Sequence, residues 1–251
     1  MLIASPRHTR EDLVAWSRFE NILQVWSQLS SYRKHVQRAR DALLSFTGSL
    51  EPCYAGTSWG KDSTVLAHLV ATLVPRVPLV WVRIEPIFNP DCLLVRDEFL
   101  RTHDVNYHEI VVHSTIAEPG TTRRGWHWAG TLETGFAECA RRWGVRRISG
   151  IRGEESGQRK RRMMHYGEQS RLTCAPIGWW TSKDVFAYLF SRTLPVHPAY
   201  ACSMGGLLDH DRIRVASLGG AKGMGHGRAE WEERYYGREM RSWTRLEGAT
   251  S

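Results

Sequence analysis

The amino-acid sequence predicts an α/β fold with a doubly wound, mostly parallel sheet. Between residues 52 and 149, short apolar segments alternate with longer segments in which apolar residues recur at helical spacing. Residues 79–84, Leu-Val-Trp-Val-Arg-Ile, are almost entirely apolar, which is typical of a strand covered by helices on both faces of a sheet. This alternation favours parallel strands joined by right-handed crossovers.

The first part of the chain is predicted to form a helical extension. Trp16, Phe19 and Leu23 recur at helical spacing, and the periodicity continues to residue 46 beneath a basic face. Charged helix faces are more often merely solvated than used for binding, so this face does not by itself indicate a partner.

The predicted sheet begins at residue 52. A strand over residues 52–57 continues through a loop into a helix with one apolar stripe, which Pro75 and Pro78 end. The elements that follow are a strand over residues 79–84, a helix over 92–102, a strand over 107–112, a helix over 132–143 and a strand over 146–149.

The carboxy-terminal part combines one more helix with irregular chain. Thr181 and Asp184 form a capping-box pattern at the start of a helix. Glycine is frequent between residues 203 and 229, which predicts a loop before a short helix around residues 230–241. We therefore expect a helical extension (1–47), an α/β domain (48–202), and a glycine-rich loop with a helix that packs on the same domain (203–251).

Composition excludes several classes of protein. There is no run of about eighteen apolar residues, and the first residues carry charges where a signal peptide needs an apolar core, so we expect a soluble, cytoplasmic protein with no membrane partner. The five cysteines are widely spaced without a CxxC pair, which signals neither a disulfide framework nor a zinc or iron–sulfur site. The net charge of +8 favours polyanionic partners.

The loop that follows the first predicted strand has the parts of a phosphate-binding site. A turn that opens a helix offers convergent N–H donors and the positive end of the helix dipole. Gly60 permits close backbone approach, Ser58 and Ser63 offer hydroxyls, Lys61 offers a positive charge, and Asp62 could hold magnesium. The spacing differs from a Walker A loop, and a simple helix-capping turn is the alternative.

These residues and three later segments resemble the phosphoadenosine phosphosulfate (PAPS) reductase-like branch of the adenine nucleotide alpha-hydrolase superfamily. The family's loop, called the PP-loop, reads SGGKDS, and Trp59 here replaces its first glycine. Residues 148–156 resemble the family's GxRxxES element, residues 176–185 its P(I/L)xxWTxxDV element, and residues 194–200 its LPxHPLY element. The resemblance covers about residues 50–202 and implies the HUP-type fold of that superfamily.

The resemblance implies which residues bind an adenine nucleotide. Gly150 would approach the ribose, and Glu85 lies where relatives place an acidic residue near the nucleotide. Arg152 and Arg159 would face an anionic group of the substrate, the alternative being surface ion pairs with neighbouring glutamates. The loop residues implied to contact the nucleotide are Ser58, Trp59, Gly60, Lys61, Asp62 and Ser63.

The preferred interpretation is an ATP pyrophosphatase-type enzyme that uses ATP, or a related adenine nucleotide such as PAPS, together with Mg²⁺. A substrate oxygen would attack the α-phosphorus, AMP would be transferred to that acceptor, and pyrophosphate would leave. The candidate catalytic residues are Lys61, Asp62, Arg152 and Arg159, and Asp62 is the candidate magnesium ligand. The basic run at residues 159–162 favours DNA or RNA as a further partner, as does the net charge, and other proteins of a modification system are also candidates.

Two alternatives come from different functional classes. A PAPS-type or adenosine phosphosulfate-type reductase would need a reactive cysteine near the carboxy terminus, whereas this sequence has no cysteine after Cys202. The other alternative is a module that binds nucleotide or nucleic acid without catalysing a reaction. In that case Trp59 would be the change that disabled turnover.

Overall fold

The computed structural model describes the chain except residues 86, 114, 117–127, 130–131, 216, 219–227 and 248–251, and gives only the backbone course of 115–116, 128–129 and 242–247. Its helices and strands run in chain order as follows: α1 (Arg10–Trp26), α2 (Ser30–Thr47), β1 (Cys53–Thr57), α3 (Lys61–Leu73), β2 (Leu79–Glu85), α4 (Asp91–Thr102), β3 (Tyr107–His113), β4 (Thr115–Ile116), β5 (Trp128–Ala129), α5 (Leu132–Trp143), β6 (Arg146–Ile148), α6 (Gly157–Tyr166), β7 (Thr173–Cys174), α7 (Ser182–Ser191) and α8 (Arg228–Glu247). Short 3₁₀ turns include η1 (Gly153–Glu155), η2 (Pro198–Ala201) and η3 (His210–Arg212).

The main sheet has five parallel strands in the order β3-β2-β1-β6-β7. Strand β1 lies at its centre, where Ala55 pairs with Leu79 on one side and with Ile148 on the other. Because the chain runs outward from β1 first to β2 and later to β6, the strand order reverses at β1. Ligands of open α/β sheets bind at such a reversal, beyond the carboxyl ends of the strands.

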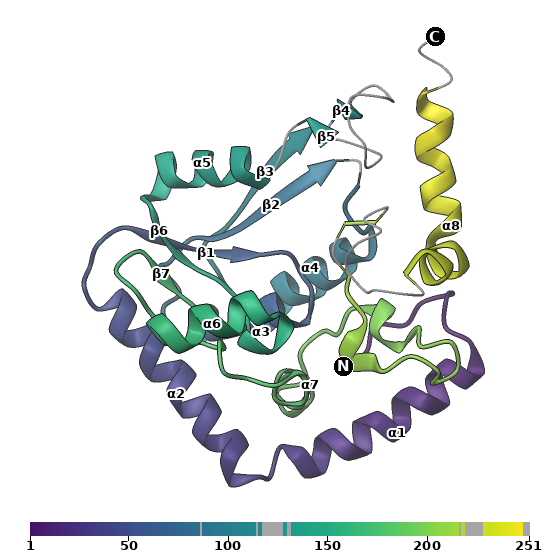
Figure 1. The fold of residues 1–251 in the computed structure, drawn as a ribbon, viewed down its shortest axis with the longest axis horizontal. Coiled ribbons are helices and arrows are strands. Elements are labelled where there is room, and N and C mark those ends of the chain that lie inside the picture. Colours follow the sequence, from purple (N-terminus) through teal and green to yellow (C-terminus); the bar gives the residue numbers. More distant parts are fainter. Residues whose placement is uncertain are drawn as a thin grey trace.

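Helices cover both faces of this sheet, so the predicted doubly wound α/β fold is confirmed (Figure 1). Alternate residues of β2 face opposite sides: Leu79 and Trp81 join the main core, whereas Val80 and Val82 pack in a smaller cluster beneath α5. At Gly135 in α5, a Cβ atom would lie 2.1 Å from Val82 Cγ1. The absence of a side chain there lets α5 lie directly on β2.

The predicted elements from residue 52 to residue 149 are confirmed with end shifts of about one residue, and the structure adds detail outside them. The predicted helical extension over residues 10–46 consists of two helices, α1 and α2. The last helix begins at Arg228 and extends to Glu247, beyond the predicted 230–241. Strands β4, β5 and β7 and helix α6 were not predicted, because each of these strands has two residues and α6 buries a single side chain, so none carries a readable periodicity.

No helix in the part of the chain that the structure describes is long and apolar enough to cross a membrane.

A buried carboxylate joins the two ends of the chain. Asp12 at the start of α1 is fully buried and accepts hydrogen bonds from the amides of Ser203 (3.0 Å) and Gly205 (2.8 Å) and from the Tyr235 hydroxyl of α8 (3.0 Å). Burial alone would raise the pKa of this carboxyl, but the bonds from Gly205, Thr9 and Tyr235 outweigh it, and the pKa is lowered from 3.8. Ionised Asp12 therefore stabilises the contact between both ends.

Replacing Asp12 by alanine should lower the free energy of unfolding by about 2–4 kcal/mol, because several buried donors lose their acceptor. Since the folded-state pKa is depressed, the contribution is complete at neutral pH and declines as the pH falls below about 4. Urea unfolding at several pH values measures both effects. Glu11→Ala, which removes an exposed carboxylate from the same helix turn, is the control and should change stability by less than about 0.5 kcal/mol.

Candidate active site

The SWGKDS loop lies at the centre of the carboxyl edge of the sheet. After β1, the chain turns through Ser58, and α3 begins at Lys61 with Gly60 as its N-cap residue. The Ser63 hydroxyl closes the turn by accepting from the Ser58 amide (3.1 Å) and donating to the Gly60 carbonyl (3.0 Å). Among the described residues, no acceptor contacts the amides of Asp62 and Ser63 in the first turn of α3. This helix start can therefore receive an anion.

Tyr200 caps the same helix start and was not singled out in the sequence. Its hydroxyl oxygen accepts a hydrogen bond from the Lys61 amide (2.9 Å), and burial raises the pKa of the phenol well above its usual value, so the hydroxyl stays protonated. A Cβ atom at Gly60 would lie 3.1 Å from Val215 Cγ2 and 3.3 Å from the Tyr200 hydroxyl. Gly60 thus permits close packing of the loop as well as ligand approach. The LPVHPAY segment carried the signal for this tyrosine.

The Trp59 side chain points away from the loop opening into the core. Trp59 has a φ of 60°, the left-handed conformation that glycine adopts most easily. Its ring is fully buried, packs on Phe99 (centroids 5.4 Å apart) and Tyr107 (5.6 Å), and donates from Nε1 to the Tyr107 hydroxyl (3.3 Å). The aromatic contacts therefore hold a backbone conformation that would otherwise require glycine.

Two cations converge on the Asp62 carboxylate. Arg152 Nε donates to Oδ1 over 2.5 Å, and Lys61 Nζ lies 3.3 Å from Oδ2. Lys61 is itself buried, over the rings of Tyr200 (5.3 Å) and Phe186 (5.9 Å). Burial tends to raise the pKa of Asp62, but the charges of Lys61 and Arg152 outweigh it, so the pKa is lowered. Asp62 is therefore ionised at neutral pH.

The Arg152 guanidinium donates its hydrogen bonds to other groups of the protein. Besides Asp62, its guanidinium donates to Glu154 Oε2 (2.5 Å), to the Trp180 carbonyl (3.2 Å) and to Ser182 Oγ (3.2 Å). Only 2% of the residue is exposed. Arg152 therefore holds the loop in place through Asp62. A substrate anion would reach the guanidinium only by displacing one of these partners.

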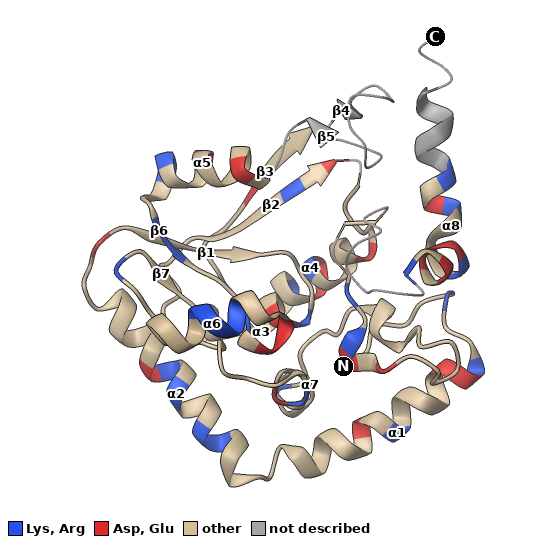
Figure 2. Ribbon diagram, viewed as in Figure 1, with Lys and Arg blue, Asp and Glu red and all other residues tan. Residues whose placement is uncertain are grey.

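Of the remaining predicted residues, Gly150 lies next to the loop, whereas Arg159 and Glu85 have other contacts. Gly150 packs on the start of α3, where a Cβ atom would lie 3.0 Å from the Asp62 carbonyl oxygen. Arg159 lies on α6, a helix rich in Lys and Arg (Figure 2), and is ion-paired with Glu155. The structure places Glu85 at the end of β2, paired with Arg83 (3.2 Å) and near His113 (3.6 Å). Ser58, Trp59, Gly60, Lys61, Asp62, Ser63, Gly150 and Arg152 are thus the predicted residues that the fold gathers at one place.

The carboxylate that was predicted to bind magnesium already contacts two cations. A divalent ion at Asp62 would have to replace Lys61 or Arg152, and no cluster of three or more His, Cys, Asp or Glu residues suited to a metal occurs among the described residues. The arrangement therefore does not fit a protein-held magnesium ion, and Lys61 and Arg152 supply the positive charge next to the loop.

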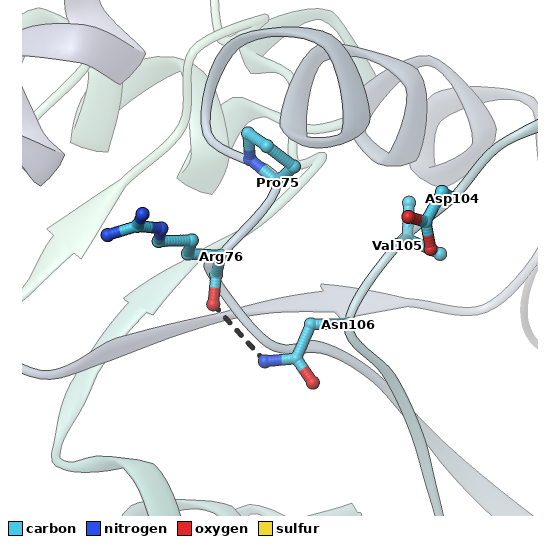
Figure 3. A pocket seen from close by; sticks show the side chains of 5 residues that line it. All are labelled: Pro75, Arg76, Asp104, Val105 and Asn106. Carbon is cyan, nitrogen blue, oxygen red and sulfur yellow. Dashed lines mark hydrogen bonds between the residues drawn. The ribbon is translucent and has the colours of Figure 1, made fainter.

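Two surface hollows lie at the opposite, amino-terminal edge of the sheet. The smaller one, of about 420 Å³, is lined by Pro75, Arg76, Asp104, Val105 and Asn106 (Figure 3), where Asn106 Nδ2 donates to the Arg76 carbonyl (3.2 Å). The larger one, of about 600 Å³, lies between the segments that lead into β1 and β2. Neither contains a residue of the loop, and parallel α/β sheets bind ligands at the other edge, so we do not assign them to the active site.

None of the thiols is a ready nucleophile. Desolvation raises the pKa of each of them, that of Cys139 to about 11 and those of Cys174 and Cys202 to about 12. Thiols with raised pKa values react slowly because the thiolate is the nucleophile. The five buried cysteines are Cys53, Cys92, Cys139, Cys174 and Cys202.

Trp59→Gly should lower the free energy of unfolding by about 2–4 kcal/mol. The lost ring leaves a cavity, whereas the relieved left-handed strain returns only about 1 kcal/mol. Trp59→Phe retains most of the packing and serves as the matched variant, with a smaller loss in urea unfolding. Equal stability of Trp59→Gly and the wild type would show that the ring does not support the loop.

The sequence is similar to a family of known proteins. Residues 52–221 match the family model described as the phosphoadenosine phosphosulfate reductase domain. The chain is 24% identical over 234 residues to the phosphoadenosine 5'-phosphosulfate reductase of Alkalilimnicola ehrlichii, a match that covers 84% of this chain and 88% of that protein.

Two solved structures also align with this chain. The PAPS reductase from Candida auris in its phosphate complex aligns with a TM-score of 0.48 and 14% identity, covering 80% of this chain and 94% of that chain. A U34-tRNA thiolase from Methanococcus maripaludis with its 4Fe–4S cluster aligns with a TM-score of 0.41 and 13% identity, covering 65% of each chain. Because the family model matches well over half of the sequence, this protein belongs to the phosphoadenosine phosphosulfate reductase domain family.

Proposed function

We propose that the protein binds ATP, or a related adenine nucleotide such as PAPS, at the SWGKDS loop and transfers the adenylyl group to an acceptor while pyrophosphate leaves. The observation that carries the proposal is the convergence of Lys61 and Arg152 on ionised Asp62 beside the free amides of α3. That arrangement suits an anionic leaving group, whereas the buried thiols do not suit a reaction that needs a thiolate.

The proposed reaction is a displacement at the α-phosphorus. An acceptor oxygen forms a bond to this phosphorus, the bond from the phosphorus to the bridging oxygen breaks, and the bridging oxygen takes the electron pair into pyrophosphate. The negative charge that grows on pyrophosphate would be stabilised by Lys61, by the amides of Asp62 and Ser63 and by the α3 dipole. The protein thus contributes positioning and electrostatics.

Asp62 has a positioning role in this proposal. Its carboxylate holds Lys61 and Arg152 side by side although the two cations repel each other. Without it, the two cations would remain close together in a mostly buried setting, which is costly, and Lys61 would lose its fixed direction. Ser58 and Ser63 offer hydroxyls to the phosphates, and Gly150, Glu85 and Arg159 remain predicted nucleotide or substrate contacts. A magnesium ion would enter this site as part of the ATP complex.

Asp62→Ala should reduce pyrophosphate release from magnesium ATP by about 100-fold or more, because preorganised charge is lost from the loop. Release is measured by a coupled phosphate assay, with and without added DNA or RNA, and ATP binding by calorimetry. Asp97→Ala removes an exposed carboxylate on α4 and is the control, with no expected change.

The result also separates the proposal from a binding module. Wild-type release that Asp62→Ala abolishes supports adenylyl transfer. Tight ATP binding by the wild type, without release under any of these conditions, would instead indicate a nucleotide-binding module.

Sulfonucleotide reduction is the second candidate, favoured by the matched family and by the reductase from Alkalilimnicola ehrlichii. It would require a thiolate to attack the sulfur of PAPS. The thiol of Cys202, the last cysteine in the sequence, is fully buried, lies 3.8 Å from the Pro198 carbonyl oxygen, and has a pKa raised to about 12. A reductase would have to expose this group or another of the buried thiols.

With PAPS and dithiothreitol, we expect the wild type and Cys202→Ser to produce no sulfite above the level without enzyme. We also expect an aromatic disulfide reagent to modify native Cys202 at most slowly, because the thiol is buried and protonated. Sulfite formation by the wild type that is lost in Cys202→Ser would replace the adenylation proposal by the reductase.

A further inference from the structure

Helix α6 carries a run of four basic residues, Arg159–Arg162, and no acidic residue. Arg159 is paired with Glu155, and Arg162 donates to Thr173 Oγ1. Lys160 and Arg161 are exposed, and their side chains make no hydrogen bond or ion pair within the described residues. Two positive charges of this run are thus free toward solvent.

Lys160 and Arg161 are the fourth and fifth residues of α6, and no carboxylate of the helix offsets their charge. Because exposed charged helix faces are often merely solvated, these two charges favour an anionic partner only together with the other groups on the same surface.

The exposed side of α6 also has apolar and aromatic groups. Met164 is 71% exposed and Tyr166 is 55% exposed. Met164 follows Lys160 by four residues and His165 follows Arg161 by four, so these pairs are neighbours on the helix surface. The His165 and Tyr166 rings contact each other with centroids 4.3 Å apart. Cations interleaved with flat rings can hold phosphates and stack on bases.

The start of α6 is joined to the candidate active site. Glu155 accepts both from the Arg152 amide (2.9 Å) and from the Arg159 guanidinium, and Arg152 in turn contacts Asp62 in the loop. Arg214 adds a further cation here by donating to the Glu155 carbonyl (3.2 Å). A polymer bound along α6 would therefore have one end next to the loop.

We propose that the exposed face of α6 binds single-stranded nucleic acid, with backbone phosphates on Lys160 and Arg161 and bases against His165 and Tyr166. An acidic protein segment would satisfy the cations but would make no use of the exposed rings, so the surface favours nucleic acid. The binding step stands on the α6 surface alone. The further step, in which the bound strand is the acceptor of the adenylyl group, rests on the function proposed above.

The test is fluorescence anisotropy with a labelled single-stranded RNA of about 20 nucleotides and the DNA of the same sequence, without ATP. The double variant Lys160→Ala/Arg161→Ala should weaken binding about tenfold at low salt. The slope of log affinity against log salt should also decrease by about 1.4, because each phosphate contact on a single strand contributes about 0.7. Tyr166→Ala should weaken binding about fivefold through lost stacking.

The matched control is Arg141→Ala/Arg142→Ala, which removes the same charge from α5, where both arginines pair with Glu138. It should bind like the wild type. Equal weakening in both double variants would overturn the proposal, since only net charge would matter, and so would polyglutamate competing as well as RNA. ATP binding serves as an independent readout: nucleic-acid binding without ATP binding would refute the proposed function and leave this inference standing.

Discussion

The carboxyl edge of the sheet depends on the ion pair between Arg152 and Asp62. A buried guanidinium is costly to desolvate unless all its donors have partners. Here its partners come from separate parts of the chain, which are Asp62 at the start of α3, Glu154 in η1, and Trp180 and Ser182 before and within α7. One side chain thereby fixes the position of the loop relative to the segments that follow β6 and β7.

Trp59 and Tyr200 also hold the loop in place. The Trp59 ring fills the space against α4 and β3, and the Tyr200 hydroxyl holds the first amide of α3. Trp59 therefore occupies a glycine-like conformation by virtue of its packing, not by conformational freedom. Replacement of the family's glycine by tryptophan is thus compatible with an intact loop, since the ring takes no space on the ligand side.

The same network extends to α6. The Glu155 carboxylate accepts hydrogen bonds from the Arg152 amide and from the Arg159 guanidinium, so it connects the basic helix with the arginine that contacts Asp62 in the SWGKDS loop. A ligand that displaced Arg159 from Glu155 would change the environment of Arg152, and through it that of Asp62. These contacts connect the α6 surface with the candidate active site.

The sequence by itself determined the features that depend on neighbouring residues. These are the strands β1, β2, β3 and β6, the end of α3 before Pro75, the turn from β1 into α3, and the capping box of Thr181 and Asp184. Local patterns report such features because strand burial, helix ends and turns follow from residues a few positions apart.

Only the tertiary structure decided the partners of the site residues. Arg152 and Asp62 are 90 positions apart, and Tyr200 and Lys61 are 139 apart, so no local pattern could show that one arginine braces the loop or that a tyrosine caps it. The two-residue strand β7 likewise exists because β6 offers it a pairing edge. The roles of Arg152 and Arg159 were open between substrate contact and ion pair because that choice depends on which carboxylates the fold brings near them.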